Sequence, residues 1–148
     1  MIEYTVIVDN NGDTFWYING KLHREDGPAV EWANGHKSWY IDGELHREDG
    51  PAVEWTDGNK SWFLNGKRHR EDGPAVEYSN GDKEWYINGK LHREDGPAIE
   101  WGSGGKYWYL NGVELTEEQH KIQTSPVKDY TVAEISELVG HNVRIVKE

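Results

Sequence analysis

The chain contains no cysteine, and only 35% of its 148 residues are hydrophobic. The absence of cysteine excludes a disulfide framework, a thiolate zinc site and thiol catalysis. No apolar run approaches the ~20 residues of a membrane-spanning helix. The first residues, MIEYTVIVDNNG, lack the basic start and apolar core of a signal peptide. We therefore expect a cytoplasmic protein that does not bind a membrane.

Basic residues are also few, because 16 Lys and Arg stand against 27 Asp and Glu, for a net charge of −11. A strongly negative surface repels phosphate backbones, so we do not expect duplex nucleic acid as a partner. A basic protein surface remains a suitable partner. What the chain has in quantity is aromatic residues: eight Trp, eight Tyr and two Phe. Each buries roughly 150–250 Å² when it packs, which can replace the missing aliphatic core.

The heptapeptide HREDGPA begins at His23 and recurs at a constant period of 23 residues without insertion or deletion. Full units open at Trp16, Trp39, Trp62 and Trp85, a partial fifth opens at Trp108, and a degenerate half-unit precedes the first. Arrays of this kind bury their apolar faces between neighbouring units and have atypical ends. We predict a repeat array over residues 1–112 and a C-terminal tail over residues 113–148.

Each unit contains two extended runs around an Asn-Gly-type turn, such as Ala29–Trp32 and Lys37–Ile41 around Asn34-Gly35. Asn-Gly between β-prone runs is typical of a type I′ hairpin, in which both central residues have positive φ. With such a turn, Val30 lies opposite Trp39. We predict positive φ at Gly35, Gly58 and Gly81, two strands per unit and nine or ten strands in all. The expected fold is mainly β, an elongated antiparallel hairpin array that forms a single twisted sheet.

The tail has a different composition and no repeat. Thr116-Glu117-Glu118-Gln119 is a capping box that predicts a short helix to about Gln123. A second box at Thr131–Glu134 predicts a helix that ends at Gly140, and Asn142–Val146 alternates like an edge strand. We expect a small α/β cap that covers the open end of the sheet. A tail that binds a partner independently is the alternative.

These units resemble the MORN repeat family, in which an aromatic-Gly hairpin with G-x-x-H-G recurs at the same period. Asn34-Gly35-His36-Lys37 matches the turn of that family, and Gly43-Glu44-Leu45-His46 matches its G-x-x-H. The sequence departs where the family has Gly after His, since Arg24, Arg47, Arg70 and Arg93 stand there. The variant W-Y-x-N-G-x-x-H-R-E-D-G-P-A is most similar to MORN-type repeats of uncharacterised phage and viral proteins. This resemblance covers about residues 5–112.

The resemblance implies an interaction or scaffold module. It also implies a setting: an accessory protein of a phage or virus that binds and inhibits a host factor in the host cytoplasm.

His-Arg-Glu-Asp contains groups suited to acid–base catalysis. It occurs four times at a fixed period, however, whereas an active site is one asymmetric constellation. The sequence therefore favours a non-enzymatic module over a hydrolase-like enzyme. The loop D-G-P lacks the alternating acids of a calcium loop, and one His per unit is too few for zinc, so we expect no metal or cofactor. We expect Arg and His to pack over aromatic rings, with Arg paired to Glu or Asp of the next unit.

The repeated aromatic and basic side chains are the candidate binding residues. The Trp row either forms the core or lines a binding face, where stacking is worth ~1–3 kcal/mol per base. Our first hypothesis is that the broad sheet face binds another protein. The alternative is a sponge for a nucleotide-type small molecule, held between aromatic and Arg side chains. The candidates are Trp39, Trp62, Trp85, Tyr40, Phe63, Tyr86, His46, His69, His92, Arg24, Arg47, Arg70 and Arg93.

Overall fold

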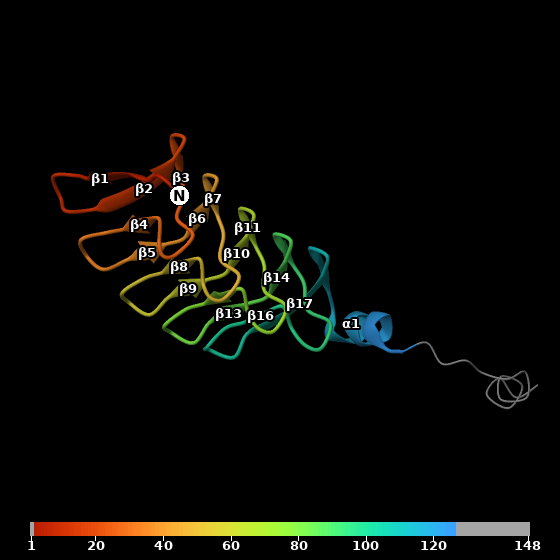
Figure 1. Ribbon diagram of the computed structural model, residues 1–148. Coiled ribbons are helices and arrows are strands. Elements are labelled where there is room, and N and C mark those ends of the chain that lie inside the picture. The colour runs from red at the N-terminus through yellow and green to blue at the C-terminus, as the bar shows by residue number, and fades with distance from the viewer. Residues whose placement is uncertain (1, 127–148) are drawn as a thin grey trace, which may run out of the picture.

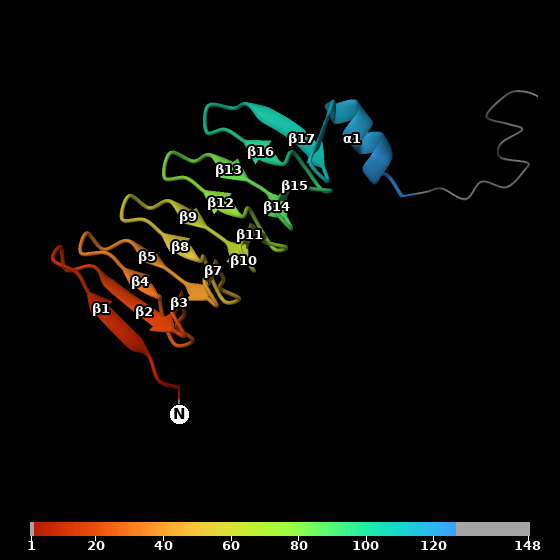
Figure 2. The ribbon, with the colours of Figure 1, turned by 90° about the horizontal axis from the view of Figure 1, so that it is seen from above.

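A computed structural model describes residues 2–126 of the chain. The strands are β1 (Thr5–Val8), β2 (Thr14–Ile18), β3 (Lys21–Leu22), β4 (Val30–Glu31), β5 (Lys37–Ser38), β6 (Tyr40–Ile41), β7 (Glu44–Leu45), β8 (Val53–Glu54), β9 (Lys60–Ser61), β10 (Phe63–Leu64), β11 (Lys67–Arg68), β12 (Val76–Glu77), β13 (Lys83–Glu84), β14 (Tyr86–Ile87), β15 (Lys90–Leu91), β16 (Ile99–Glu100), β17 (Lys106–Leu110) and β18 (Val113–Leu115), followed by helix α1 (Glu117–Thr124). They form an elongated stack of hairpins from β1 at one end to α1 at the other (Figure 1; Figure 2). The predicted fold class, a mainly β antiparallel hairpin array, is confirmed.

Most strands join one long antiparallel sheet of 12 strands, in the order β1-β2-β4-β5-β8-β9-β12-β13-β16-β17-β18, with β3 beside β2. Strands β6–β7, β10–β11 and β14–β15 form separate two-stranded hairpins. These small hairpins project from the long sheet on one side of the array (Figure 1). Two rows of hairpins therefore run in parallel along the molecule.

The prediction of two strands per unit was wrong, because a unit contains two hairpins. Asp42 and Gly43 both have positive φ, 51° and 87°, and Ile41 pairs with Glu44 across them. They form the two-residue turn of a small hairpin, although the sequence pattern placed them in a loop. Successive small hairpins are tied by backbone hydrogen bonds, since the Gly66 N–H donates to the Leu45 carbonyl at 2.9 Å.

The register predicted for the long hairpins was also wrong, although the glycine prediction is confirmed. Gly35, Gly58 and Gly81 have φ of 92°, 93° and 93°. The turn is nevertheless a three-residue loop, closed by the Trp32 N–H donating to the His36 carbonyl at 3.0 Å. Val30 consequently pairs with Ser38 and not with Trp39. A shift of one residue moves every side chain to the other face of a strand.

Small side chains fill the space between repeats. Ala29, Ala52, Ala75 and Ala98, the last residue of each heptapeptide, are fully buried. Ser38 and Ser61 are buried beside Val30 and Val53 on one face of the long sheet. Neighbouring strands lie about 4.8 Å apart, so consecutive repeats are close and small side chains fill most of the space between them. Most aromatic residues are half-buried around this narrow core, whereas Trp55 and Tyr107 are exposed.

The C-terminal end of the array is covered by α1. The predicted capping box is confirmed, since the Gln119 N–H donates to Thr116 Oγ1 at 3.1 Å and the Thr116 N–H donates to Gln119 Oε1 at 2.9 Å. Strand β18 pairs with β17, so the sheet continues past residue 112 to Leu115. The helix and strand predicted at Thr131–Gly140 and Asn142–Val146 lie outside the described residues. Within residues 2–126, no helix has the length and apolar character needed to cross a membrane.

Replacing Gly58 with Val should lower the free energy of unfolding by about 1 kcal/mol or more, because a β-branched residue is strained at a φ of 93°. Urea denaturation followed by tryptophan fluorescence measures the effect. Lys60→Val is the matched control, because it places the same side chain at an exposed position of β9. Equal unfolding midpoints for the two variants would contradict the assigned turn.

Candidate functional site

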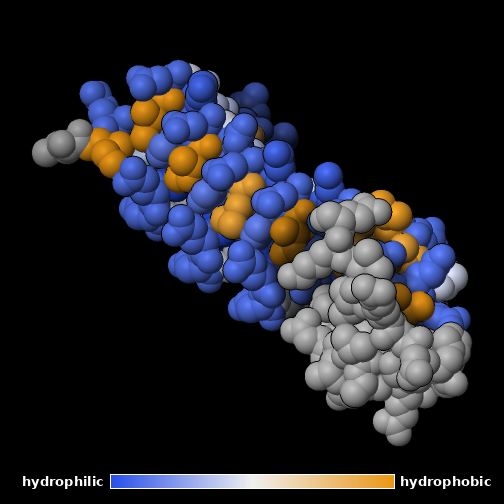
Figure 3. Space-filling model, turned by 90° about the vertical axis from the view of Figure 1, so that its right-hand side faces the viewer, coloured by the Kyte–Doolittle hydropathy of each residue, from blue (hydrophilic) through white to orange (hydrophobic). Residues whose placement is uncertain are grey.

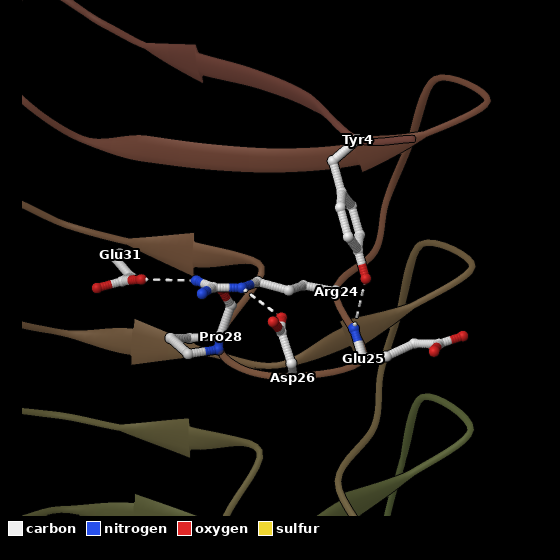
Figure 4. Close-up of polar contacts among 6 residues, drawn as sticks. All are labelled: Tyr4, Arg24, Glu25, Asp26, Pro28 and Glu31. Carbon is white, nitrogen blue, oxygen red and sulfur yellow. Dashed lines mark hydrogen bonds and ion pairs between the residues drawn. The ribbon is translucent and has the colours of Figure 1, made fainter. Parts of the chain in front are cut away.

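Each HREDGP loop is built around its arginine. The Arg24 guanidinium carbon lies 4.0 Å from the centre of the Trp16 ring. Its Nε donates to Asp26 at 3.0 Å, and its Nη1 donates to the Pro28 carbonyl at 3.2 Å and to Glu31 at 2.9 Å (Figure 4). These contacts combine a cation–π interaction with charge-assisted hydrogen bonds. One side chain therefore fixes the Trp, the loop and the adjacent strand β4.

The same arrangement recurs in the other units. Arg47, Arg70 and Arg93 lie 4.0, 4.1 and 4.0 Å from their Trp rings and bond the equivalent Asp, Pro and Glu. Every one of these ion pairs lies within a single unit. The predicted ladder from Arg to an acid of the next unit is therefore wrong, because the loop folds back onto its own strand.

The contact with the loop arginine lowers the pKa of three loop aspartates. The hydrogen bonds from Arg47 and Arg70, and then the charges of the same residues, lower the pKa of Asp49 and Asp72. The hydrogen bond from Arg93 is likewise the largest cause of the lowered pKa of Asp95. These three aspartates therefore stay ionised further into the acidic range than an ordinary Asp does.

The histidines connect one unit to the next. The backbone N–H of Asn65, at the turn of a small hairpin, donates to Nδ1 of His46 at 3.2 Å. Equivalent bonds join Asp42 to His23, Asn88 to His69 and Asn111 to His92. The prediction that His packs over aromatic rings missed this role. The imidazole accepts the N–H of a residue that the two-residue turn holds at positive φ.

Three equivalent grooves lie between consecutive loops. They have volumes of about 810, 830 and 900 Å³ from the N-terminal end. Groove 1 lies between loops 24–28 and 46–49 and is also lined by Trp39 and Ile41. Groove 2 lies between loops 47–51 and 69–72 and is also lined by Trp62 and Leu64. Groove 3 lies between loops 70–74 and 92–95 and is also lined by Trp85 and Ile87. Figure 3 faces the side on which the loops and small hairpins project, and shows hydrophobic groups recurring along it between hydrophilic rows.

The rims of the grooves are acidic. Glu48, Glu71 and Glu94 have side chains that are 87%, 86% and 78% exposed. The neighbouring Asp of each loop neutralises the arginine, so the exposed Glu carries the excess negative charge. Among residues 2–126, no three His, Cys, Asp or Glu side chains are grouped to hold a metal ion. The grooves therefore combine an apolar floor with a negative rim.

The structure gathers most of the predicted site residues in these grooves. The Trp, His and Arg candidates line them, whereas Tyr40, Phe63 and Tyr86 do not. Burial raises the pKa of Tyr40 and Tyr86. Each Trp ring of the row is half-buried under its arginine and also borders a groove.

Sequence reasoning missed one cluster that occurs once. Arg68 stands where other units have Leu, and Glu84 stands where they have Ser38 and Ser61. The two groups lie 3.9 Å apart, and Arg68 Cζ lies 5.3 Å from the Tyr86 ring centre. Burial is the largest cause of the raised pKa of Tyr78, and the Glu84 charge adds to it. Position-by-position comparison of the units would have revealed that Arg68 and Glu84 both depart from the repeat. The two departures together place a positive charge beside a buried carboxylate.

Comparison of the chain with the models of known protein families and with curated proteins found no match. The MORN-type resemblance accordingly stays a prediction from the sequence motifs. The shape and chemistry of the grooves carry the functional argument.

Gly73→Ala should destabilise the array by about 1–3 kcal/mol, as overpacking does, because an added Cβ would lie 2.9 Å from Arg70 Cζ. A double-mutant cycle with Arg70→Met tests the cause. In the Met background the same Gly73→Ala change should cost much less. An equal cost in both backgrounds would show that the glycine is not required by the guanidinium.

Acid should destabilise the array through the loop aspartates. The pKa values of Asp49, Asp72 and Asp95 are lowered in the folded state from an ordinary value of 3.8. Their stabilising effect is therefore present above pH 3.8 and is lost as the pH falls through the folded-state values. Urea denaturation between pH 2 and 6 should show this loss. The triple variant with Asn at all three positions should have a flatter pH profile, and an unchanged profile would contradict the assignment.

Proposed function

We propose that this protein is a non-enzymatic binding module that holds a basic partner protein stoichiometrically along its three grooves. The observation that carries the proposal is the recurrence of one groove, with an apolar floor and a negative rim, at each junction between loops. Apolar contact supplies affinity, and the rim charges steer a basic surface into register. Repetition lets several weak contacts act together on one partner.

The chemistry of the grooves supports a protein partner over a nucleotide-type ligand. The arginine side chains are only 18–23% exposed, and their Nε and Nη1 groups already donate to carboxylates and a backbone carbonyl. A phosphate group would have to compete with these bonds and pass the exposed glutamates of the rim. A lysine or arginine side chain meets no such barrier. The phage or viral setting, and a host factor as the partner, stay predictions within this proposal.

Repetition also supports binding over catalysis. Each groove has the same Trp, His, Arg, Glu and Asp, so no groove holds a distinct set of reactive groups. Three equivalent grooves can each contribute part of the affinity for one large partner. A catalytic reaction needs only one site.

Replacing the rim residues Glu48, Glu71 and Glu94 together with Gln should weaken binding of a basic protein about tenfold, since exposed charges contribute roughly 0.2–1 kcal/mol each. The side chains are exposed, so the fold should be retained. Titration calorimetry against a small panel of basic proteins, with cytochrome c and histone H1 among them, measures the effect at two salt concentrations.

The matched control removes the same number of charges outside the grooves, by Glu3→Gln, Glu44→Gln and Glu118→Gln, at three exposed positions. This control variant should bind as the parent does. Equal weakening by both variants would mean that net charge, and not the grooves, attracts the partner. Multiple turnovers of a chemically changed product would overturn the binding function itself.

A further inference from the structure

The chain fills the outermost positions of the groove row with its own side chains. At the N-terminal end the Tyr4 ring packs edge-on against Trp16 at 5.5 Å, and its hydroxyl accepts the Glu25 N–H at 3.3 Å (Figure 4). At the other end His120 of α1 is 3% exposed, and its Nε2–H donates to the Arg93 carbonyl at 2.6 Å. Both contacts use backbone groups of a loop.

The same backbone groups recur inside the three open grooves. Among residues 2–126, no hydrogen-bond partner reaches the amides of Glu48, Glu71 and Glu94, which correspond to Glu25. The same holds for the carbonyls of Arg24, Arg47 and Arg70, which correspond to Arg93. Each open groove therefore offers one backbone donor from one wall and one backbone acceptor from the other. The ends of the molecule show that polypeptide side chains reach both kinds of group.

We infer that the open grooves bind a single extended peptide segment that carries Lys or Arg at every third position. This inference rests on the proposed function and specifies its partner. A cationic side chain in each groove can donate to the loop carbonyl, as His120 does, and lie beside the exposed glutamate of the rim. Its aliphatic stem can cover the apolar floor formed by Ile41, Leu64 or Ile87.

The spacing of the grooves selects the period of three. Each repeat adds two strands to the long sheet, so successive grooves are about 9.6 Å apart at a strand spacing of about 4.8 Å. Three residues of a polyproline II segment make one full turn and span about 9.3 Å, so every third side chain points to the same side. In a β-strand the side chains alternate between the two faces, so cations at every third position would point to opposite sides. Two or four polyproline II residues span about 6.2 or 12 Å and drift out of register over three grooves.

An extended segment fits these grooves better than a helix. The backbone amides and carbonyls of a helix bond one another, so its interior cannot use the donor and acceptor that each groove presents. An extended segment has its own amides and carbonyls available. The rim also repels acidic segments, which leaves basic ones.

The test uses the full chain and three fluorescent ten-residue peptides of identical composition, each with three lysines among serine and alanine. The lysines are placed at every third position, at every fourth position, or together at one end. Fluorescence anisotropy at physiological salt should give at least tenfold tighter binding for the period-three peptide. Spermine, which has charge but no peptide groups, should compete poorly with it.

A variant in the middle groove tests the site directly. Leu64→Arg places a cation in groove 2 and should abolish the preference for period three, whereas Leu64→Met should retain it. Circular dichroism and the unfolding midpoint show whether each variant is folded. If Leu64→Arg unfolds, the Gln rim variant described above replaces it and should reduce the preference.

The outcomes separate this inference from the proposed function. Equal affinities for the three peptides, or equally tight binding of spermine, would overturn the period-three segment. If basic proteins still bind through the rim glutamates in that case, the proposed function stands without it. If neither the peptides nor basic proteins bind, both this inference and the proposed function are wrong.

Discussion

The stacking of each loop arginine on its tryptophan is the contact on which the other features depend. The guanidinium stands about 4 Å above the ring, and its Nε and Nη1 donate to Asp, Glu and a Pro carbonyl of the same unit. A loop with Gly and Pro has little regular structure to hold it, so this side chain replaces a hydrogen-bond ladder. The close approach to the guanidinium explains Gly at position 50, where a Cβ would lie 2.9 Å from Arg47 Cζ. Since the loops are the groove walls, the arginines shape the grooves.

A second constraint is the distance between repeats, which the backbone sets. The long sheet and the small hairpins are both hydrogen-bonded from unit to unit, so neither row can change its spacing alone. Small residues such as Ala52 and Ser61 fill most of the axis. The large aromatics are thereby placed around the narrow core, half-buried, where they stabilise the loops and also border the grooves. A chain poor in aliphatic residues can fold in this way because the aromatic rings supply the buried apolar area that aliphatic side chains usually provide.

The sequence period, the hairpin architecture and the capping box at Thr116 were predictable, because each depends on local turn chemistry or on repetition. The register was not. Asn34-Gly35 suits both a two-residue and a three-residue loop, and only tertiary packing decides between them, so Val30 was paired with the wrong residue. The Trp, His and Arg side chains that line the grooves were singled out because they recur. The packing of Arg over an aromatic ring was predicted and is confirmed. The hydrogen-bond partners were missed, since no sequence rule tells that Arg47 bonds its own unit while His46 bonds the next.

The capped ends give the array a defined valency. Consecutive loops enclose a groove between them, so four loops leave three grooves, and Tyr4 and His120 occupy the surfaces beyond the first and last loops. Duplication of one unit would add one groove and about 9.6 Å of length, because the strand spacing is fixed. It would require no change in the chemistry of any existing contact. For the proposed ligand, each added groove would engage a segment that its neighbours already hold, so affinity would rise with length. The 23-residue period is kept without a single insertion across the four units, so the three grooves are built from equivalent residues at the same spacing.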